Sequence, residues 1–324
     1  MILILSEDTD QSTNRVIDWL YFNNKDFIRI NTESFIHHIS LCLNDEQHLS
    51  IEVQSENNED TFSLQNIDSF WFRRGTMMPR KQLLNEIENT NLKKEISNTL
   101  TSEWTILSSF LIKQFEKKKH LGNYGLRIPN KLTVLQIAVK HGIDIPDTMV
   151  TSSLEKLKEF KNKHASIITK PIYEILMYAD QQYAFISRTE TVGEDYIENL
   201  PDSFFPMLFQ ENLRKNFEIR VFFIKDKFFP AAFFSQNNAK TKSDFRNESN
   251  VKYRSIPYNL PPKILKKLKT MMHDLGLNTG SIDLVYTQEK KYVFLEVNPV
   301  GQFDTVSEDC NYFIEKEIVK FLLN

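Results

Sequence analysis

The chain has 324 residues, of which 41% are hydrophobic and 26% charged, as is typical of a globular protein with two or three domains. Its 40 basic and 43 acidic residues give a formal charge of −3. The chain therefore lacks the overall excess of basic residues that is typical of proteins that bind nucleic acid through its backbone charge. The two cysteines, Cys42 and Cys310, exclude a disulfide framework and a tetracysteine zinc site, and they fit a reducing cytoplasm. No stretch resembles a membrane span, and Met1–Ser6 predicts a first strand rather than a signal peptide.

The start of the chain predicts a β-α-β unit. Ile2–Leu5 and Phe27–Ile30 are short apolar segments typical of strands, and Thr13–Phe22 between them has the apolar spacing of a helix. Such an opening is typical of an α/β domain with a partly parallel sheet. Two later segments, residues 48–53 and 61–64, are consistent with a hairpin.

The segment Ser69–Gly75 predicts a strand that runs into a turn with two arginines. Two guanidinium groups beside a backbone turn suit a phosphate or a carboxylate, so Arg73 and Arg74 are candidates for an anion site. From the spacing alone, two solvated arginines at a strand end are the simpler interpretation.

A long helix is predicted from about Arg80 to Lys118. Its apolar residues follow helical spacing and are Leu92, Ile96, Leu100, Trp104, Leu107 and Leu111. This apolar face favours core packing or a subunit interface over ligand binding. Gly122 and Gly125 follow the helix and predict the first domain boundary.

Two segments in the middle of the chain carry lysines at the ends of predicted elements. Asn130–Gly142 predicts a helix with Lys131 in its first turn, where a lysine is unremarkable. Ser166–Ile172 predicts a buried strand in which Lys170 follows the apolar run. Burying a lysine at a strand end costs free energy unless the lysine meets an anion, so Lys170 is a candidate for anion binding.

Two further strands follow in the chain. Met207–Leu213 is an apolar strand with a polar end, and Asn216–Ile224 is a strand with alternating character. Glu218 and Arg220 lie two residues apart in the second strand, so their side chains point to the same face.

The stretch Ser281–Phe303 predicts a β-hairpin with oxygen-bearing side chains at one end. Asp283 lies on the first strand, and Glu296 and Asn298 lie two apart on the second, so these two share a face. Three hard oxygen ligands suit Mg²⁺, which often combines a few protein oxygens with substrate phosphates. An ordinary hairpin with polar residues facing water is the alternative.

The sequence Leu-Glu-Val-Asn-Pro-Val-Gly-Gln-Phe, residues 295–303, resembles the metal-binding end of the ATP-grasp fold. It is similar to the ATP-grasp peptide ligases that make graspetides, which include microviridin-type ligases and the maturases of grasp-with-spasm systems. Trp-Phe-Arg-Arg, residues 71–74, resembles the corresponding place in these ligases. The resemblance implies an α/β (α+β) ATP-grasp fold. Its expected parts are an N-terminal α/β pre-ATP-grasp domain (1–122), a central subdomain with a lid (123–205) and a C-terminal subdomain with the metal and catalytic site (206–324).

The resemblance also implies a role for each candidate residue. ATP is expected to contact Lys131, Lys170, Gln210, Glu211 and Leu213. Two Mg²⁺ ions are expected to be held by Asp283, Glu296 and Asn298. Arg220 and Arg246 are the expected catalytic residues. The residues expected to bind the substrate are Arg73, Arg74, Asp244 and Arg246.

The lid departs from the family pattern. ATP-grasp enzymes cover the phosphates with a glycine-rich lid whose amides contact oxygens, whereas residues 171–182 of this chain contain no glycine. Either the lid is stiffer and more apolar, or it does not make those backbone contacts. No phosphate contact is therefore assigned to this segment.

The expected activity is that of an ADP-forming ligase. It would phosphorylate Asp or Glu side chains of a ribosomal precursor peptide and then form intramolecular ω-ester or ω-amide crosslinks. The expected partners are the leader and core of that peptide and a second copy of the chain in a homodimer, with no nucleic acid and no membrane. The expected location is the cytoplasm.

Two other functions stay open. One is an amino-acid ligase of the glutamate-ligase type, against which the ending Val-Gly-Gln-Phe argues mildly. The other is a nucleotide-binding scaffold without activity, which the glycine-free lid favours. The sequence does not encode the identity of the precursor or the choice between ester and amide.

Overall fold

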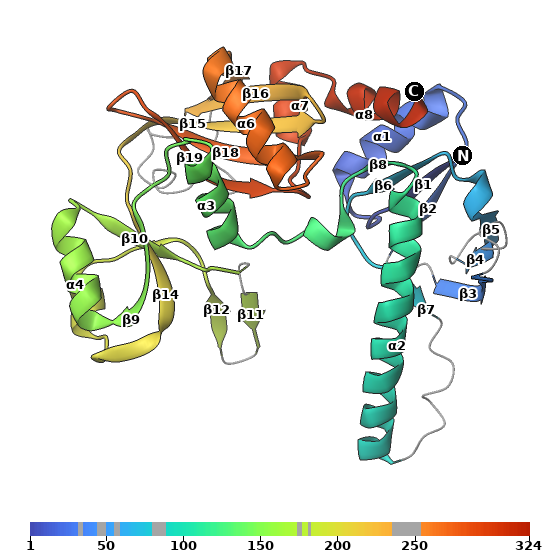
Figure 1. Cartoon of the computed structure of the whole chain (residues 1–324), viewed down its shortest axis with the longest axis horizontal. Coiled ribbons are helices and arrows are strands. Elements are labelled where there is room, and N and C mark those ends of the chain that lie inside the picture. The colour runs from blue at the N-terminus through green and yellow to red at the C-terminus, as the bar shows by residue number, and fades with distance from the viewer. Residues whose placement is uncertain are drawn as a thin grey trace. The chain divides into compact units, whose positions relative to one another are not determined.

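The computed structural model describes residues 1–31, 35–43, 50–54, 59–79, 89–173, 177–180, 183–234 and 254–324. The chain forms two compact units (Figure 1). Unit 1 comprises Met1–Arg127, Gln302–Ser307 and Phe313–Asn324, and unit 2 comprises Ile128–Gly301 and Glu308–Tyr312. The chain therefore passes between the units four times, after residues 127, 301, 307 and 312.

A parallel sheet with strand order β2-β1-β6-β8 forms the centre of unit 1. Its strands are β1 (Ile2–Leu5), β2 (Phe27–Ile30), β6 (Ser69–Phe72) and β8 (Lys119–Leu121). The helix α1 (Gln11–Phe22) joins β1 to β2, so the predicted β-α-β unit is confirmed. Every residue of β1 and β6 is buried, as expected for a parallel sheet that is covered on both faces.

A second, smaller sheet of unit 1 has the order β5-β4-β3-β7. Its strands are β3 (Phe35–Ser40), β4 (Ser50–Gln54), β5 (Glu59–Ser63) and β7 (Met78–Pro79), and a 3₁₀ turn (Leu64–Asn66) follows β5. The antiparallel pair β4–β5 confirms the hairpin predicted from residues 48–53 and 61–64.

The long helix α2 (Thr90–Glu116) of unit 1 is shorter than predicted. Asn89 has an extended backbone, and its side-chain oxygen accepts hydrogen bonds from the backbone N–H groups of Asn91 and Leu92. This N-cap starts α2 at Thr90 instead of at about Arg80, and residues 80–88 lie outside the described residues. A 3₁₀ turn (Tyr124–Leu126) precedes unit 2.

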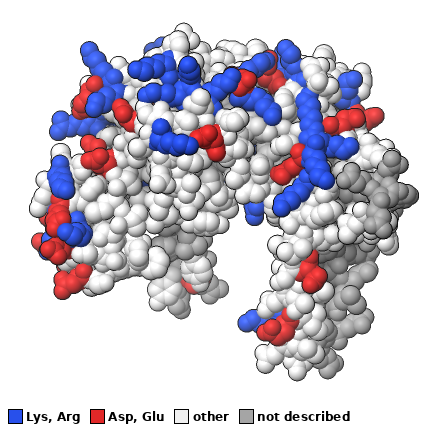
Figure 2. Space-filling view, viewed as in Figure 1, with Lys and Arg blue, Asp and Glu red and all other residues white. Residues whose placement is uncertain are grey.

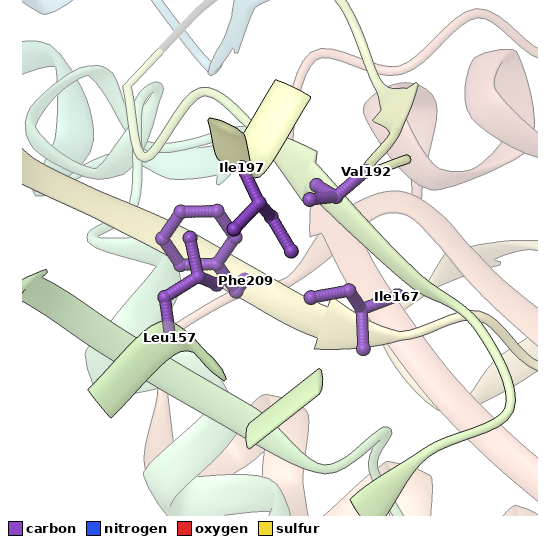
Figure 3. Close-up of a cluster of buried hydrophobic side chains, with 5 residues drawn as sticks. All are labelled: Leu157, Ile167, Val192, Ile197 and Phe209. Atoms are coloured by element: carbon purple, nitrogen blue, oxygen red, sulfur yellow. The ribbon is translucent and has the colours of Figure 1, made fainter. Parts of the chain in front are cut away.

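Unit 2 begins with α3 (Lys131–Lys140) and a sheet of order β13-β10-β14-β9. Its strands are β9 (Thr148–Ser153), β10 (Ile167–Lys170), β13 (Glu190–Thr191) and β14 (Ser203–Glu211). The helices α4 (Leu154–Lys163) and α5 (Glu194–Glu198) supply part of its core. Figure 3 shows this core, in which Leu157, Ile167, Val192, Ile197 and Phe209 point toward one another. A separate hairpin, β11 (Met177–Ala179) with β12 (Ala184–Ile186), follows β10 in the chain.

The second sheet of unit 2 is antiparallel, with the order β17-β16-β15-β18-β19. Its strands are β15 (Lys215–Ile224), β16 (Lys227–Phe234), β17 (Arg254–Pro257), β18 (Thr279–Thr287) and β19 (Tyr292–Asn298). The pair β18–β19 confirms the hairpin predicted over 281–303. The helix α6 (Pro262–Asp274) buries Leu268, Met271 and Met272, and α3 packs against both α6 and β19.

The end of the chain forms two helices with a short break between them. The helix α7 (Asp304–Cys310) ends before Asn311, and α8 (Ile314–Leu323) starts after Phe313. Asn311 and Phe313 have backbone φ angles of 53° and 52°, so a right-handed helix cannot run through them. The helix α8 belongs to unit 1, where it packs against α1. Among the helices that the structure describes, none combines the length and the apolar character that a membrane crossing requires.

Candidate active site

A pocket in unit 2 gathers residues of β10 and β14 from the first sheet and of β15, β18 and β19 from the second. The space between the lining residues is about 850 Å³ when the part open to solvent is included. The predicted site residues that line it are Lys170, Gln210, Glu211, Leu213, Arg220, Asp283 and Glu296. Residues far apart in the sequence therefore meet in one pocket.

Three of these side chains form a row across neighbouring strands. In the strand register, Arg220 of β15 lies opposite Asp283 of β18, and Asp283 lies opposite Glu296 of β19. Directly opposite residues of an antiparallel pair share a face and have neighbouring side chains. Ser281 lies opposite Asn298, which places Asn298 one row further along the same hairpin.

The guanidinium of Arg220 engages both oxygens of the Asp283 carboxylate. The Arg220 Nε donates to Oδ1 at 2.9 Å, and Nη2 donates to Oδ2 at 3.2 Å. Both side chains are 17% exposed. A two-point contact of this kind, partly shielded from water, fixes the orientation of both groups.

Tight backbone packing fixes the turn that carries Asn298. The Asn298 side-chain oxygen accepts from the backbone N–H of Val300 at 3.1 Å. Gly280 has a φ of +149°, and a Cβ there would lie 2.8 Å from the Asn298 carbonyl oxygen. A Cβ on Gly301 would lie 2.5 Å from Cβ of Ser281. Only glycine at these two positions lets β18 and the turn approach so closely.

The donor set at this end of the hairpin fits a magnesium ion. Two carboxylates lie opposite each other, and an amide oxygen follows in the next row. No group of three or more His, Cys, Asp or Glu side chains that could hold a metal occurs in the part of the chain that the structure describes. Two carboxylates and an amide suit an ion that completes its shell with phosphate oxygens and water rather than with protein ligands alone.

The strand end around Gln210 is fixed by hydrogen bonds to its neighbours. The Gln210 side chain is 1% exposed, and its Nε2 donates to the Thr148 hydroxyl at 2.9 Å. The backbone N–H of Glu211 donates to the carbonyl oxygen of Asp147 at 2.9 Å. Gln210, Glu211 and Leu213 thus line the pocket from a rigid strand end, and their contacts with a nucleotide stay predictions.

Lys131 lies near the chain that continues from Lys170. Its Nζ donates to the carbonyl oxygen of Pro171 at 3.1 Å. This contact joins the first turn of α3 to the residue that follows β10. Lys170 itself ends β10 and lines the pocket. The predicted lid segment, 171–182, includes β11, and its residues 174–176 and 181–182 lie outside the described residues.

A second ion pair in the pocket joins two residues of β15. Lys215 Nζ donates to Glu218 Oε1 at 2.8 Å, and the two side chains are 12% and 11% exposed. The sequence placed Glu218 on the same face as Arg220 by alternation, but its pairing with Lys215 needed the backbone of β15. The strand register shifts between Lys215 and Phe217, so a simple period of two does not reach Lys215.

Arg73 and Arg74 lie in unit 1, at the carboxyl end of β6. The side chain of Arg73 is 5% exposed, and its Nε lies 3.1 Å from Asp10 Oδ2. Burial lowers the pKa of Arg73 to about 10, and the negative charge of Asp10 opposes this shift. Arg74, with a side chain 32% exposed, lies 3.5 Å from the same oxygen. The substrate role of both residues stays a prediction, as does that of Asp244 and Arg246, which lie outside the described residues.

Two family models match the chain, one after the other. Residues 1–121 match the model described as the MvdD pre-ATP grasp domain, and residues 128–322 match the RimK-like ATP-grasp domain. Among curated proteins, the alpha-aminoadipate–LysW ligase LysX of Sulfurisphaera tokodaii is 25% identical over 205 residues, which are 60% of this chain and 67% of LysX.

Solved structures cover the whole chain. The macrocyclase MdnC of Microcystis aeruginosa, bound with the precursor peptide MdnA, has a TM-score of 0.79 and 25% identity, over 100% of this chain and 99% of MdnC. A RiPP-associated ATP-grasp ligase of Chryseobacterium gregarium, in complex with ADP and a leader and core peptide, has a TM-score of 0.81 and 22% identity, over 99% of this chain and 96% of that one. The predicted ATP-grasp fold is therefore confirmed.

Proposed function

Because the chain belongs to the RimK-like ATP-grasp family, we propose that it is an ATP-dependent peptide ligase that crosslinks a ribosomal precursor peptide. A side-chain carboxylate of Asp or Glu in the peptide attacks the γ-phosphate of ATP, which gives an acyl phosphate and ADP. A hydroxyl or amine of the same peptide then attacks the acyl carbon and releases phosphate. The product is an ω-ester or an ω-amide within the peptide.

The observation that carries the proposal is the pocket of unit 2 in a chain that matches a peptide macrocyclase along its full length. The pocket holds lysine and arginine for phosphate groups beside two opposed carboxylates for a metal. Side chains fixed before the reaction stabilise developing charge without reorganisation, which is the main contribution of such sites to phosphoryl transfer.

For the nucleotide, we propose that Lys131 and Lys170 contact phosphates, while Gln210, Glu211 and Leu213 contact the adenine and ribose. The hydrogen bond of Gln210 to Thr148 supports this by fixing the strand end that would face the base. The acyl phosphate must be shielded from water, so the hairpin β11–β12 is proposed as the moving cover.

For the metal, we propose two Mg²⁺ ions held by Asp283, Glu296 and Asn298. When bound, they would neutralise charge on the β- and γ-phosphates. On the acceptor side, we propose that Arg220 and Arg246 stabilise the carboxylate and its acyl phosphate. Arg73, Arg74 and Asp244 are proposed to contact the peptide, with Arg74 the more accessible of the two neighbouring arginines.

The partner in this proposal is a precursor peptide with a leader and a core. The MdnC complex contains a precursor peptide, and the complex of the Chryseobacterium gregarium ligase contains a leader and core peptide. A second copy of the chain is proposed as a further partner, because much of α2 exposes apolar side chains. The reaction is proposed to take place in the cytoplasm, where ATP is available and the two cysteines stay reduced.

A second candidate function has a specific observation in its favour. The similarity to LysX supports an amino-acid ligase, which would join a free amino acid to a carboxylate instead of closing a ring. Both functions use the same acyl phosphate, and they differ in the nucleophile and in the mass of the product.

The test is intact-mass analysis of a candidate precursor peptide after incubation with the protein, ATP and Mg²⁺. We expect the loss of one water molecule for each link. Glu296→Gln should abolish the loss, because it removes a proposed metal ligand. Glu289→Gln, an exposed position in the turn of the same hairpin, is the matched control and should keep it.

Other products would decide against the proposal. A gain of amino-acid mass would support the amino-acid ligase. Nucleotide binding without formation of ADP, for each candidate peptide, would support a scaffold without activity.

A further inference from the structure

The contact between Arg220 and Asp283 joins two groups that have different proposed partners. Arg220 is proposed to act on the substrate carboxylate, and Asp283 is proposed to hold a metal ion. In the structure, however, one guanidinium covers both oxygens of that carboxylate, at 2.9 and 3.2 Å. A metal ion at Asp283 would therefore compete with a protein cation for the same ligand.

We propose that Arg220 and the divalent ion exchange at Asp283. Arg220 holds the carboxylate in the orientation that the metal needs. A divalent ion bound at Asp283 would displace the guanidinium, which would then face the anionic groups in the pocket. Arg220 thus becomes available to substrate only when the metal is in place. The inference rests on the proposed metal role of Asp283 and adds to it a coupling between metal binding and substrate binding.

Because the strand register fixes the backbone, the proposed exchange requires only side chains to move. Arg220 and Asp283 lie opposite each other on β15 and β18, and Glu296 lies on the other side of Asp283 on β19. Backbone hydrogen bonds of three adjacent strands fix these positions. A dication beside Asp283 would repel the guanidinium at short range in a partly buried site, while nucleotide phosphates would attract it.

The pair Lys215–Glu218 provides a matched comparison in the same pocket. It is also a short contact between a basic and an acidic side chain, at 2.8 Å, and its side chains are as little exposed as those of Arg220 and Asp283. Glu218 has no proposed metal role. Removing either Lys215 or Arg220 takes one positive charge from the pocket, but only removal of Arg220 takes a competitor from a metal ligand.

The experiment is a titration of the nucleotide-free, full-length protein with Mn²⁺, followed by electron paramagnetic resonance of the free ion. Mn²⁺ prefers oxygen ligands as Mg²⁺ does. Arg220→Ala should bind Mn²⁺ about tenfold more tightly than the wild type. The reason is that removing one positive charge close to the metal ligand should raise the affinity by roughly a factor of ten. Lys215→Ala should change the affinity by less than about threefold. Asp283→Asn should strongly weaken Mn²⁺ binding, both in the wild type and in the Arg220→Ala variant.

Three results would overturn the exchange. They are an unchanged or weaker affinity in Arg220→Ala, an equal gain in Lys215→Ala, and no effect of Asp283→Asn. If Arg220→Ala does not fold, Arg220→Lys takes its place. A lysine makes a single-point contact instead of a fork, so this variant should show a smaller gain in the same direction. The mass measurement on the peptide decides the proposed ligase activity separately, because Mn²⁺ binding does not depend on the peptide.

Discussion

Asp10 is the acidic residue that compensates the positive charges of Arg73 and Arg74 in unit 1. Its carboxylate is 1% exposed, lies 3.1 Å from Arg73 and 3.5 Å from Arg74, and caps α1 by accepting from the backbone N–H of Thr13. Asn caps a helix as well as Asp does, so Asp10→Asn removes the charge and keeps the cap. We expect the free energy of unfolding of unit 1 to fall by about 3–5 kcal/mol, the usual cost of removing one partner of a buried ion pair.

The measurement is urea unfolding followed by tryptophan fluorescence. All three tryptophans of the chain, Trp19, Trp71 and Trp104, lie in unit 1, so the signal reports on that unit alone. Asp8→Asn is the control, because Asp8 is 46% exposed and its contact with Arg29 should be worth less than about 1 kcal/mol. Equal losses in the two variants would contradict the importance of the buried pair.

The two cysteines should differ in reactivity. Cys42 is exposed, whereas Cys310 is buried, and burial raises the pKa of its thiol to about 11. Only a thiolate attacks a disulfide reagent, and at pH 8 roughly one Cys310 in a thousand is ionised. We expect an aromatic disulfide reagent to label one thiol per chain rapidly and the second only after unfolding. Rapid labelling that persists in Cys42→Ser would show that Cys310 is accessible.

The hairpin β18–β19 depends on glycine at the end that carries the proposed metal ligands. A Cβ on Gly280 would lie 2.8 Å from a carbonyl oxygen and 3.0 Å from Cα of Pro299, so Gly280→Ala must displace the backbone beside Asn298. We expect Mn²⁺ affinity to fall about tenfold and stability to fall by about 1–3 kcal/mol. Gly193→Ala is the control, since nothing lies within 4 Å of a Cβ there. Unchanged Mn²⁺ affinity in Gly280→Ala would contradict a role of this turn in holding the metal.

Helices and strands whose pattern of apolar residues lies within one short segment could be predicted from the sequence. The breaks between elements were harder to predict. Apolar spacing alone was enough for β1, α1 and β2. The break between α7 and α8 was not predictable, because it depends on left-handed backbone at Asn311 and Phe313, two residue types that do not require that conformation. In the site, the shared face of Glu218 and Arg220 followed from alternation. The contact between Arg220 and Asp283 could not be predicted, because it joins residues 63 positions apart through a strand register.

At the scale of the whole molecule, α2 has an apolar face that unit 1 covers only in part. Buried side chains occur only near its end, at Leu111, Ile112 and Phe115, while Leu92 and Leu100 are 53% and 44% exposed. Figure 2 shows few charged side chains along much of this helix on the visible face. The predicted interface between two copies is therefore best placed on the first turns of α2.

This interface can be tested by light scattering during size-exclusion chromatography. We expect a dimer for the wild type and a monomer for Leu92→Glu combined with Leu100→Glu, since burying two carboxylates in an apolar interface costs several kcal/mol. The control combines Asn91→Glu with Asn98→Glu. It adds the same charge on the opposite face of the helix and should stay dimeric. A wild type that is monomeric at micromolar concentration would remove the homodimer from the proposal.

The four passages of the chain between its units have a consequence for the order in which the protein is made. A ribosome releases residues from the N-terminus onward, so α1 appears early, and α8, which packs against it, appears much later. All of Ile128–Gly301 emerges in between. All residues of the pocket are therefore synthesised before the helix that packs against α1, so unit 1 can finish its packing only after the residues of the pocket have been made.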